Sequence, residues 1–211
     1  MSAKSEGQDS ASGDPAPANP AESTAEVADP APSHPASIVF PKRIVLTGFM
    51  GAGKTTVGQL LARRLNWRFL DVDIEIEAAA ESSIADLFLI HGEPWFRQVE
   101  YDTICRLADS EHVVLALGGG AIEDERTRQL LLQAEETQLV HLHASLGTVL
   151  VRCKGTDDLR PVLRDRANLE ARYERRLPLY RLAHLTIAVD SLLPEAVVDS
   201  ILEQIGIASQ V

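Results

Sequence analysis

A glycine-rich segment that ends in lysine and threonine has the clearest chemistry in the sequence. Residues 48–55 read Gly-Phe-Met-Gly-Ala-Gly-Lys-Thr, which matches the pattern GxxxxGK(S/T) of nucleotide-binding loops. In such a loop the backbone N–H groups turn toward the phosphates, and the helix that follows adds the positive end of its dipole. We expect Lys54 to reach the β- and γ-phosphates of ATP and Thr55 to bind Mg²⁺. The predicted ATP-binding residues of the loop are Gly51, Ala52, Gly53, Lys54, Thr55 and Thr56.

The context of this segment favours nucleotide binding over a glycine-rich turn that only caps a helix. A short apolar run at residues 44–47 precedes it and an amphipathic stretch to Leu65 follows, so the loop lies between a predicted strand and a predicted helix. No Asn-Lys-x-Asp segment is present to recognise guanine. The formal net charge of -11 disfavours a nucleic-acid motor. A compact kinase is the class that fits these observations.

Two carboxylates follow the second predicted strand, residues 68–71. Asp71 and Asp73 lie at its carboxyl end, where open α/β sheets bind ligands. In extended geometry residues two apart point to the same face. We expect Asp71 to bind the metal and Asp73 to accept a hydrogen bond from the hydroxyl that attacks the γ-phosphorus. The alternative for Asp73 is that it only caps the helix expected to start near Ile74.

The third predicted strand, residues 112–117, runs into three glycines instead of an acidic metal ligand. Gly118, Gly119 and Gly120 leave room for a ligand ring and offer N–H groups to its oxygens. A plain tight turn is the competing explanation. We predict that these glycines bind the substrate.

The elements that position these residues alternate between short apolar runs and longer amphipathic stretches. This alternation from Arg43 onward is typical of βαβ units in an α/β domain with a parallel sheet. Residues 1–37 are acidic and rich in Pro and Ala, which predicts a disordered tail, since a transit peptide would be Arg-rich and poor in acids. We therefore expect the tail at 1–37 and one catalytic domain at 38–211.

Composition limits the partners and the compartment. The acidic net charge argues against nucleic acid, and no apolar stretch is long enough to span a membrane. Cys105 and Cys153 form neither a zinc pattern nor a disulfide framework. We expect a cytoplasmic monomer that binds only small-molecule substrates.

Taken together, the motifs resemble those of the shikimate kinase family, over residues 42 to 190 and in the family's order. The matching segments are residues 46–58, the Asp71-Val72-Asp73 segment with Ile76-Glu77, and residues 83–88, 92–97, 100 and 118–121. The resemblance implies a P-loop kinase fold with a five-stranded parallel sheet in the order 2-3-1-4-5, a lid and a substrate-binding subdomain. It also implies transfer of the γ-phosphoryl group of ATP to the 3-hydroxyl of shikimate, with Mg²⁺.

The resemblance further assigns several arginines. It implies that Arg97 and Arg176 bind the substrate carboxylate, which agrees with the planar fork of donors on a guanidinium. Glu100 lies three residues after Arg97 on one predicted helix and is expected to orient it. The lid arginine corresponds to Arg160, which would neutralise charge on the transferring phosphoryl group. Arg152 corresponds to the arginine that lies against adenine.

Other residues are interpreted as structural. The remaining arginines of this region fit a solvated helical face: Arg164, Arg166, Arg172, Arg175 and Arg181. His141 and His143 alternate on a predicted strand and could form a metal pair, but no third ligand lies nearby in sequence.

Two rival functions remain open. One is another small-metabolite kinase of this fold, such as a gluconate kinase or a nucleotide kinase. Arg97 with Arg176 argues for a carboxylate-bearing acceptor, and Asp73 with the glycine triplet argues for a polyol ring. The other is a non-catalytic nucleotide-binding regulator, which would be expected to have lost Lys54, Asp73 or Arg160, although all three are present.

Overall fold

The computed structural model describes residues 40–154 and 166–207. In this part of the chain a parallel sheet has five strands in the order β2-β3-β1-β4-β5. The strands are β1 (Arg43–Thr47), β2 (Arg68–Asp71), β3 (Val113–Ala116), β4 (Thr137–His143) and β5 (Leu185–Ala188). The predicted fold class and strand order are confirmed. Of the three inner strands, β1 and β3 are largely apolar and almost wholly buried, as expected of a parallel sheet covered on both faces.

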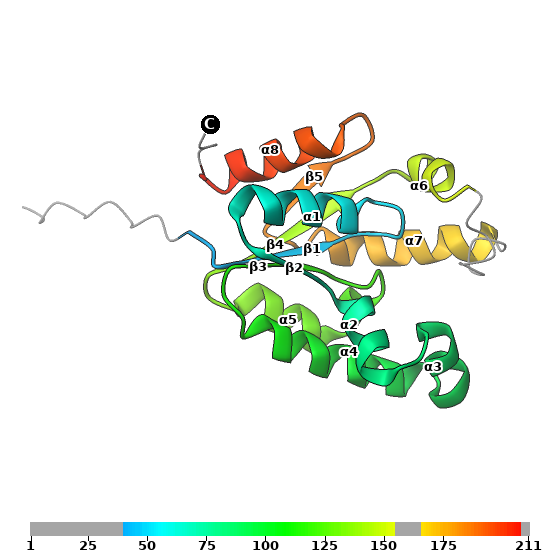
Figure 1. The fold of residues 1–211 in the computed structure, drawn as a ribbon. Coiled ribbons are helices and arrows are strands. Elements are labelled where there is room, and N and C mark those ends of the chain that lie inside the picture. Colours follow the sequence, from blue (N-terminus) through cyan, green and yellow to red (C-terminus); the bar gives the residue numbers. More distant parts are fainter. Residues whose placement is uncertain (1–39, 155–165, 208–211) are drawn as a thin grey trace, which may run out of the picture. The chain divides into compact units, whose positions relative to one another are not determined.

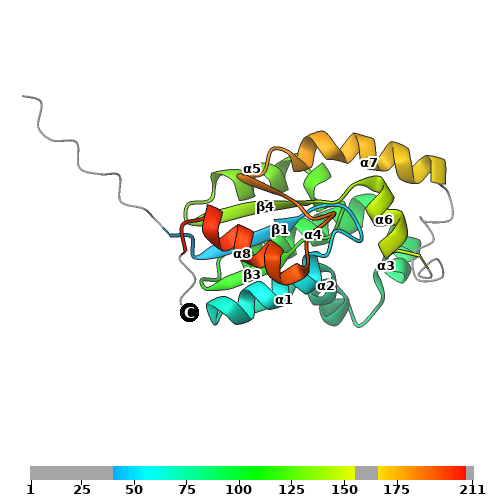
Figure 2. The same ribbon diagram turned by 90° about the horizontal axis from the view of Figure 1, so that it is seen from above.

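Helices lie on both faces of this sheet. In chain order they are α1 (Lys54–Leu65), α2 (Val72–Ala80), α3 (Ile84–His91), α4 (Glu93–Ala108), the 3₁₀ helix η1 (Ala121–Glu123), α5 (Glu125–Gln133), α6 (Leu146–Arg152), α7 (Arg166–Tyr180) and α8 (Pro194–Gln204). Figures 1 and 2 show α1 and α8 over one face and α4 and α5 over the other, which gives three layers. The short helices α2 and α3 pack against α4 (Figure 1).

Strand register brings three of the predicted functional segments together at the carboxyl ends of the strands. Leu46 of β1 and Asp71 of β2 both pair with Ala116 of β3. The backbone N–H of Leu117 then donates to the carbonyl of Leu46 at 3.0 Å. The phosphate loop, the Asp71 segment and the glycine triplet therefore all leave the sheet at the same level, at the carboxyl ends of parallel strands.

The helix after β2 starts earlier than expected, and this corrects one premise of the sequence reasoning. α2 begins at Val72 rather than near Ile74, so Asp73 lies in its first turn and not on extended backbone. Asp71 is the N-cap of α2, and its Oδ1 accepts from the N–H of Asp73 at 3.2 Å. An aspartate cap of this kind satisfies a helix N–H that has no partner within the helix. The capping role considered for Asp73 belongs to Asp71.

The stretch that follows the glycine triplet forms two short helices, η1 and α5, where the sequence pattern favours one helix over residues 123–133. Asp124 interrupts it in an extended conformation and accepts from the N–H of Arg126 at 2.8 Å, so α5 starts at Glu125 while η1 precedes it. Other boundaries differ from the prediction by one or two residues, as helix ends commonly do.

Three predictions fall on residues that the structure does not describe. The proposed tail at 1–37, the lid residue Arg160 and the structural role of Arg164 all lie outside residues 40–154 and 166–207. The domain boundary at residue 38 therefore stays a prediction. Within the described ranges no helix is both long and apolar enough to cross a membrane.

Candidate active site

The phosphate loop joins β1 to the first turn of α1. Gly51 and Gly53 have φ angles of 73° and 98°, which side chains rarely tolerate. The Nζ of Lys54 donates to the carbonyls of Gly48 and Phe49 at 2.8 and 3.2 Å. The ammonium group of Lys54 therefore lies against the start of the loop, and the N-terminus of α1 lies at its end. A cation beside a helix N-terminus is an arrangement suited to binding phosphate.

Thr55 and Asp71 form a small cluster of oxygen atoms beside this loop. The Thr55 hydroxyl donates to Oδ2 of Asp71 at 2.9 Å, which joins the start of α1 to the end of β2. Hydroxyl and carboxylate oxygens are the ligands that Mg²⁺ prefers, and in nucleotide sites the ion keeps water and phosphate oxygens as its other ligands. In the described ranges no group of three or more His, Cys, Asp or Glu side chains could hold a metal by itself. The donor set thus fits an ion that is bound together with a nucleotide.

Asp73 and Glu100 converge on Gly118. A Cβ atom placed on Gly118 would lie 2.7 Å from Oδ1 of Asp73 and 2.7 Å from Oε1 of Glu100, so a side chain here would collide with both carboxylates. Burial raises the pKa of Asp73, and the charge of Asp71 raises it further, against the opposing effects of Lys54 and Arg97. Burial likewise raises the pKa of Glu100, which Arg97 opposes. Asp73 is therefore a stronger proton acceptor than an ordinary exposed aspartate.

Arg97 on α4 is held by two acids of its own helix. Its Nη1 donates to Oε2 of Glu100 at 2.6 Å, and its Nε and Nη2 donate to Oε1 of Glu93 at 3.3 and 3.0 Å. A Cβ on Gly120 would come within 2.8 Å of the guanidinium carbon of Arg97. The glycine triplet therefore lies directly against the Arg97 side chain, and the expected orienting contact from Glu100 is present.

Arg176 on α7 approaches from the opposite side. The residue is only 5% exposed, and its Nε donates to Oε2 of Glu123 at 2.7 Å. A Cβ on Gly119 would lie 3.8 Å from Nη1 of Arg176. One turn further along α7, the hydroxyl of Tyr180 donates to the carbonyl of Gly119 at 2.6 Å. These contacts tie the middle and the end of α7 to the glycine triplet and η1.

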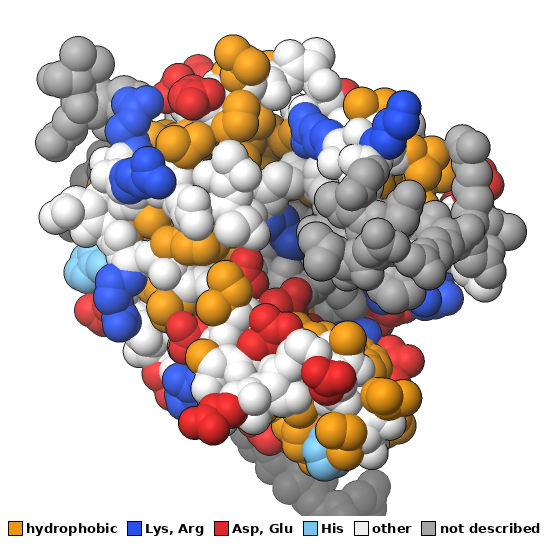
Figure 3. All heavy atoms as spheres, turned by 45° about the vertical axis from the view of Figure 1, so that its right-hand side comes forward, with side chains coloured by type: hydrophobic (Ala, Val, Ile, Leu, Met, Phe, Trp, Pro, Cys, Tyr) orange, Lys and Arg blue, Asp and Glu red, His pale blue; other side chains and the backbone are white. Residues whose placement is uncertain are grey.

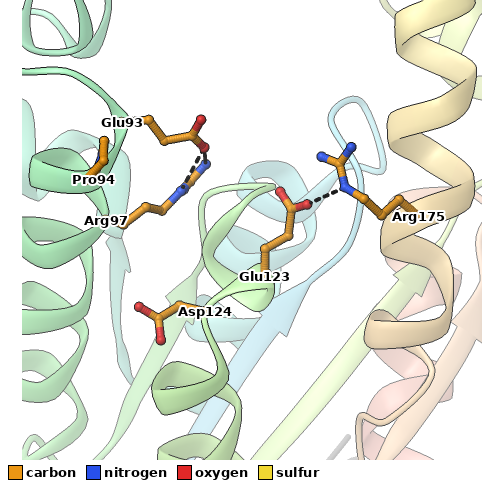
Figure 4. Close-up of a pocket in the computed structure, with 6 residues that line it drawn as sticks. All are labelled: Glu93, Pro94, Arg97, Glu123, Asp124 and Arg175. Carbon is orange, nitrogen blue, oxygen red and sulfur yellow. Dashed lines mark hydrogen bonds and ion pairs between the residues drawn. The ribbon is translucent and has the colours of Figure 1, made fainter.

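A pocket of about 440 Å³ opens between these elements. It is lined by Glu93, Pro94, Arg97, Glu123, Asp124 and Arg175. Figure 4 shows the α4 residues and Arg175 of α7 on opposite sides, with Glu123 between them. The space-filling view in Figure 3 shows a recess in the surface that contains a basic side chain, with acidic side chains below it. Charges of both signs therefore line the approach to the site.

The structure brings together most of the residues selected from the sequence. The glycine triplet at residues 118–120 is surrounded by the side chains of Asp73, Arg97 and Arg176. The phosphate loop is connected to this group through the hydrogen bonds from Thr55 to Asp71 and from Asp73 to Asp71. Arg152 lies at the loop, where its Nη1 donates to the carbonyl of Ala52 at 3.3 Å and its Nη2 to that of Val189 at 2.8 Å. Its contact with adenine stays a prediction. Arg160 lies outside the described residues.

Sequence reasoning missed three residues of this site: Glu93, Glu123 and Tyr180. Glu93 stands four residues before Arg97 on the same helix, a spacing that could have indicated the ion pair. Glu123 and Tyr180 make their contacts across 53 and 61 residues of chain, and no local pattern signals such pairs. Arg175, interpreted as part of a solvated face, is indeed exposed, with 61% of its side chain accessible, and it also donates to Oε1 of Glu123 at 2.9 Å.

His141 and His143 have structural surroundings. The His141 ring stacks on Tyr180 with centroids 5.2 Å apart, and Thr186 Oγ1 lies 3.4 Å from its Nδ1. Burial lowers the pKa of His141 to about 4, assisted by His143 and nearby cations. It is therefore neutral at physiological pH and packs against Tyr180, whose hydroxyl donates to the carbonyl of Gly119.

Comparison with known proteins gives a consistent result. A family model described as shikimate kinase matches residues 50–206 of the chain. A shikimate kinase of Rhodopseudomonas palustris is 46% identical over 159 residues, which are 74% of this chain and 77% of the relative. One from Persephonella marina is 38% identical over 165 residues, or 78% of this chain and 99% of the relative. A solved shikimate kinase from Acinetobacter baumannii in complex with shikimate has a TM-score of 0.73 at 36% identity, covering 80% of this chain and 94% of that one.

Proposed function

The chain belongs to the shikimate kinase family, and we infer that it transfers the γ-phosphoryl group of ATP to the 3-hydroxyl of shikimate. The products are shikimate 3-phosphate and ADP, and the reaction serves the biosynthesis of chorismate and aromatic amino acids. The observation that supports this most strongly is the convergence of a phosphate loop, a buried carboxylate and two arginines beside one glycine triplet. This set provides groups for a nucleotide, an attacking hydroxyl and a substrate carboxylate.

Asp73 is proposed as the group that receives the proton of the attacking hydroxyl. As the oxygen forms its bond to the γ-phosphorus, the bond between that phosphorus and the bridging oxygen of ADP breaks. The proton of the hydroxyl passes to Asp73, whose pKa is raised by burial. Lys54 would balance the negative charge on the phosphates, and Arg160 would do so on the transferring group.

The substrate carboxylate is proposed to bind Arg97 and Arg176, which face the glycine triplet from α4 and α7. The fork of N–H donors on each guanidinium matches the two oxygens of a carboxylate. The N–H groups of Gly118, Gly119 and Gly120 are proposed to bind ring hydroxyls. Positioning of both reactants would then supply most of the catalysis.

Thr55 and Asp71 are proposed to bind Mg²⁺ together with ATP, because their oxygens are already in contact beside the phosphate loop. When bound, the ion would neutralise charge on the phosphate oxygens. The loop residues Gly51, Ala52, Gly53, Lys54 and Thr56 would bind the phosphates, and Arg152 would lie near the adenine.

We propose further that the protein is a cytoplasmic monomer whose partners are ATP and shikimate alone. The acidic net charge of -11 supports the exclusion of nucleic acid. Size-exclusion chromatography with light scattering would test the monomer, and cell fractionation would test the compartment.

A coupled assay of ADP release with Mg-ATP tests the proposed function. The acceptors to compare are shikimate, quinate, gluconate, AMP and none. Release with shikimate that is lost in Asp73→Asn and Arg176→Ala supports the proposal. Release with gluconate or AMP instead would assign a sister kinase, and the absence of release with every acceptor would favour a non-catalytic regulator.

A further inference from the structure

Glu123 lies between two consecutive arginines of α7 and touches both. Its Oε2 accepts from Nε of Arg176 at 2.7 Å and lies 2.6 Å from Nη2 of the same side chain. Its Oε1 accepts from Nε of Arg175 at 2.9 Å. The glutamate belongs to η1, three residues beyond Gly120 and 53 residues before Arg176, so this contact is made entirely by the fold.

The contact occupies one particular edge of the Arg176 guanidinium. Nε and Nη2 form that edge, and both point at the same oxygen of Glu123. The third nitrogen, Nη1, is the one near Gly119, where an added Cβ would lie 3.8 Å from it. A guanidinium is planar and rigid, so holding one edge fixes the direction of the other. Glu123 thereby directs the Nη1 side of Arg176 toward the glycine triplet.

Burial makes this support necessary. Arg176 is 5% exposed, and a buried guanidinium without a carboxylate partner is strongly destabilised. Partial burial of Glu123 by itself would raise its pKa, but the hydrogen bonds from Arg176 and Arg175 outweigh this effect and hold the pKa below its ordinary value. The Glu123 carboxylate is therefore ionised near neutral pH, opposite the Arg176 guanidinium.

We propose that Glu123 is a positioning residue for the carboxylate of the acceptor, acting through Arg176. This inference rests on the proposed function, since it assumes that Arg176 binds a carboxylate. Glu123 holds the Nε edge of Arg176 and leaves the Nη1 side to the substrate, while Arg175 fixes the second oxygen of Glu123. Substrate binding then requires no reorientation of Arg176.

Arg97 shows the same arrangement in a weaker form. Its Nε and Nη2 edge is held by Oε1 of Glu93, at 3.3 and 3.0 Å. The side chain of Glu93 is 63% exposed, whereas that of Glu123 is 22% exposed. Exposed ion pairs within one helix contribute little, so Glu93 is expected to matter less than Glu123. We therefore expect Glu93→Ala to raise the KM for shikimate less than Glu123→Ala does.

The test compares wild type, Glu123→Ala, Glu123→Gln and, as a matched control, Asp199→Asn, which removes an exposed ion pair with Arg64. Each is assayed with shikimate and with its methyl ester, which lacks the negative charge. We expect Glu123→Ala to raise the KM for shikimate about tenfold, the effect of losing one charge-assisted contact, with kcat and the KM for ATP nearly unchanged. Glu123→Gln should recover part of the loss, because its amide oxygen still accepts from Nε. The methyl ester should show little difference between wild type and Glu123→Ala, and Asp199→Asn should match wild type.

Three results would overturn the inference. A lower KM for shikimate in Glu123→Ala would mean that Glu123 competes with the substrate carboxylate. Equal losses with shikimate and with the ester, together with a lower melting temperature, would assign a purely structural role. Wild-type activity with shikimate is measured first and tests the proposed function separately; if it is absent, the inference fails with it.

Discussion

The hydroxyl of Thr55 donates a 2.9 Å hydrogen bond to Oδ2 of Asp71, so the first turn of α1 is linked to the end of β2. The other oxygen of Asp71 accepts the N–H of Asp73. One carboxylate therefore orients both the proposed metal site and the start of the helix that carries the proposed base.

Asp71→Asn is expected to raise the Mg²⁺ concentration needed for half-maximal activity by about tenfold or more, because the ion loses a charged oxygen ligand. Asparagine is as good an N-cap as aspartate, so α2 should be retained. A titration of activity against Mg²⁺ at fixed ATP measures the change, with circular dichroism as the check on folding. An unchanged Mg²⁺ requirement would remove Asp71 from the metal site.

Asp73→Asn is expected to lower kcat by about 100-fold or more, since a general base contributes on that scale. The base must be ionised to act, so activity of the wild type should fall as pH drops through the pKa of Asp73. Burial raises that pKa, and the inflection should lie above the ordinary aspartate value of 3.8. A pH profile of kcat/KM measures it, and the same inflection persisting in Asp73→Asn would assign it to another group.

Tyr180→Phe removes the 2.6 Å hydrogen bond to the carbonyl of Gly119 while keeping a buried ring of the same shape. Burial raises the pKa of Tyr180 well above its ordinary range, so the hydroxyl is a donor at every working pH. We expect a stability loss of about 1 kcal/mol, the usual value of one hydrogen bond, and a higher KM for shikimate. Denaturant unfolding and steady-state kinetics measure the two effects.

Tyr173→Phe is the matched control for Tyr180. It lies on the same helix and its hydroxyl donates to the carbonyl of Ala144 at 3.0 Å, away from the glycine triplet. It should lose similar stability without a change in the KM for shikimate. If both variants raise the KM equally, the hydrogen bond to Gly119 has no special part in substrate binding.

Gly118→Ala should weaken shikimate binding strongly, because its Cβ would lie 2.7 Å from oxygens of both Asp73 and Glu100. Forcing a methyl group into such a site costs about 1–3 kcal/mol. Gly147→Ala is the control, since its Cβ would meet only the Ser145 hydroxyl at 3.9 Å. Calorimetric titration with shikimate compares the variants, and equal affinity in Gly118→Ala and wild type would contradict the close packing around the triplet.

Much of the fold and part of the site could be predicted from the sequence. The phosphate loop has a local motif, and the family resemblance supplied the strand order that the structure confirms. Asp73 was selected for a reason that was partly wrong, because β2 ends at Asp71 and the following residues turn into α2. Its approach to Gly118 depends on this helical turn, which the assumption of an extended strand could not predict.

The residue that holds Arg176 could not be found in this way. A hydrogen bond such as that between Glu123 and Arg176 depends on how η1 and α7 pack, and neither residue carries a pattern that points to the other. Local spacing indicates partners only within one helix, as for Arg97 with Glu93 and Glu100.

The pocket between α4 and α7 has a consequence for inhibitor chemistry. Three acids, Glu93, Glu123 and Asp124, line it together with Arg97 and Arg175. A purely anionic mimic of the substrate would use only the arginines and would be repelled by the acids. A zwitterionic compound, with an ammonium group placed toward these acids and a carboxylate toward Arg97, would complement both signs of charge.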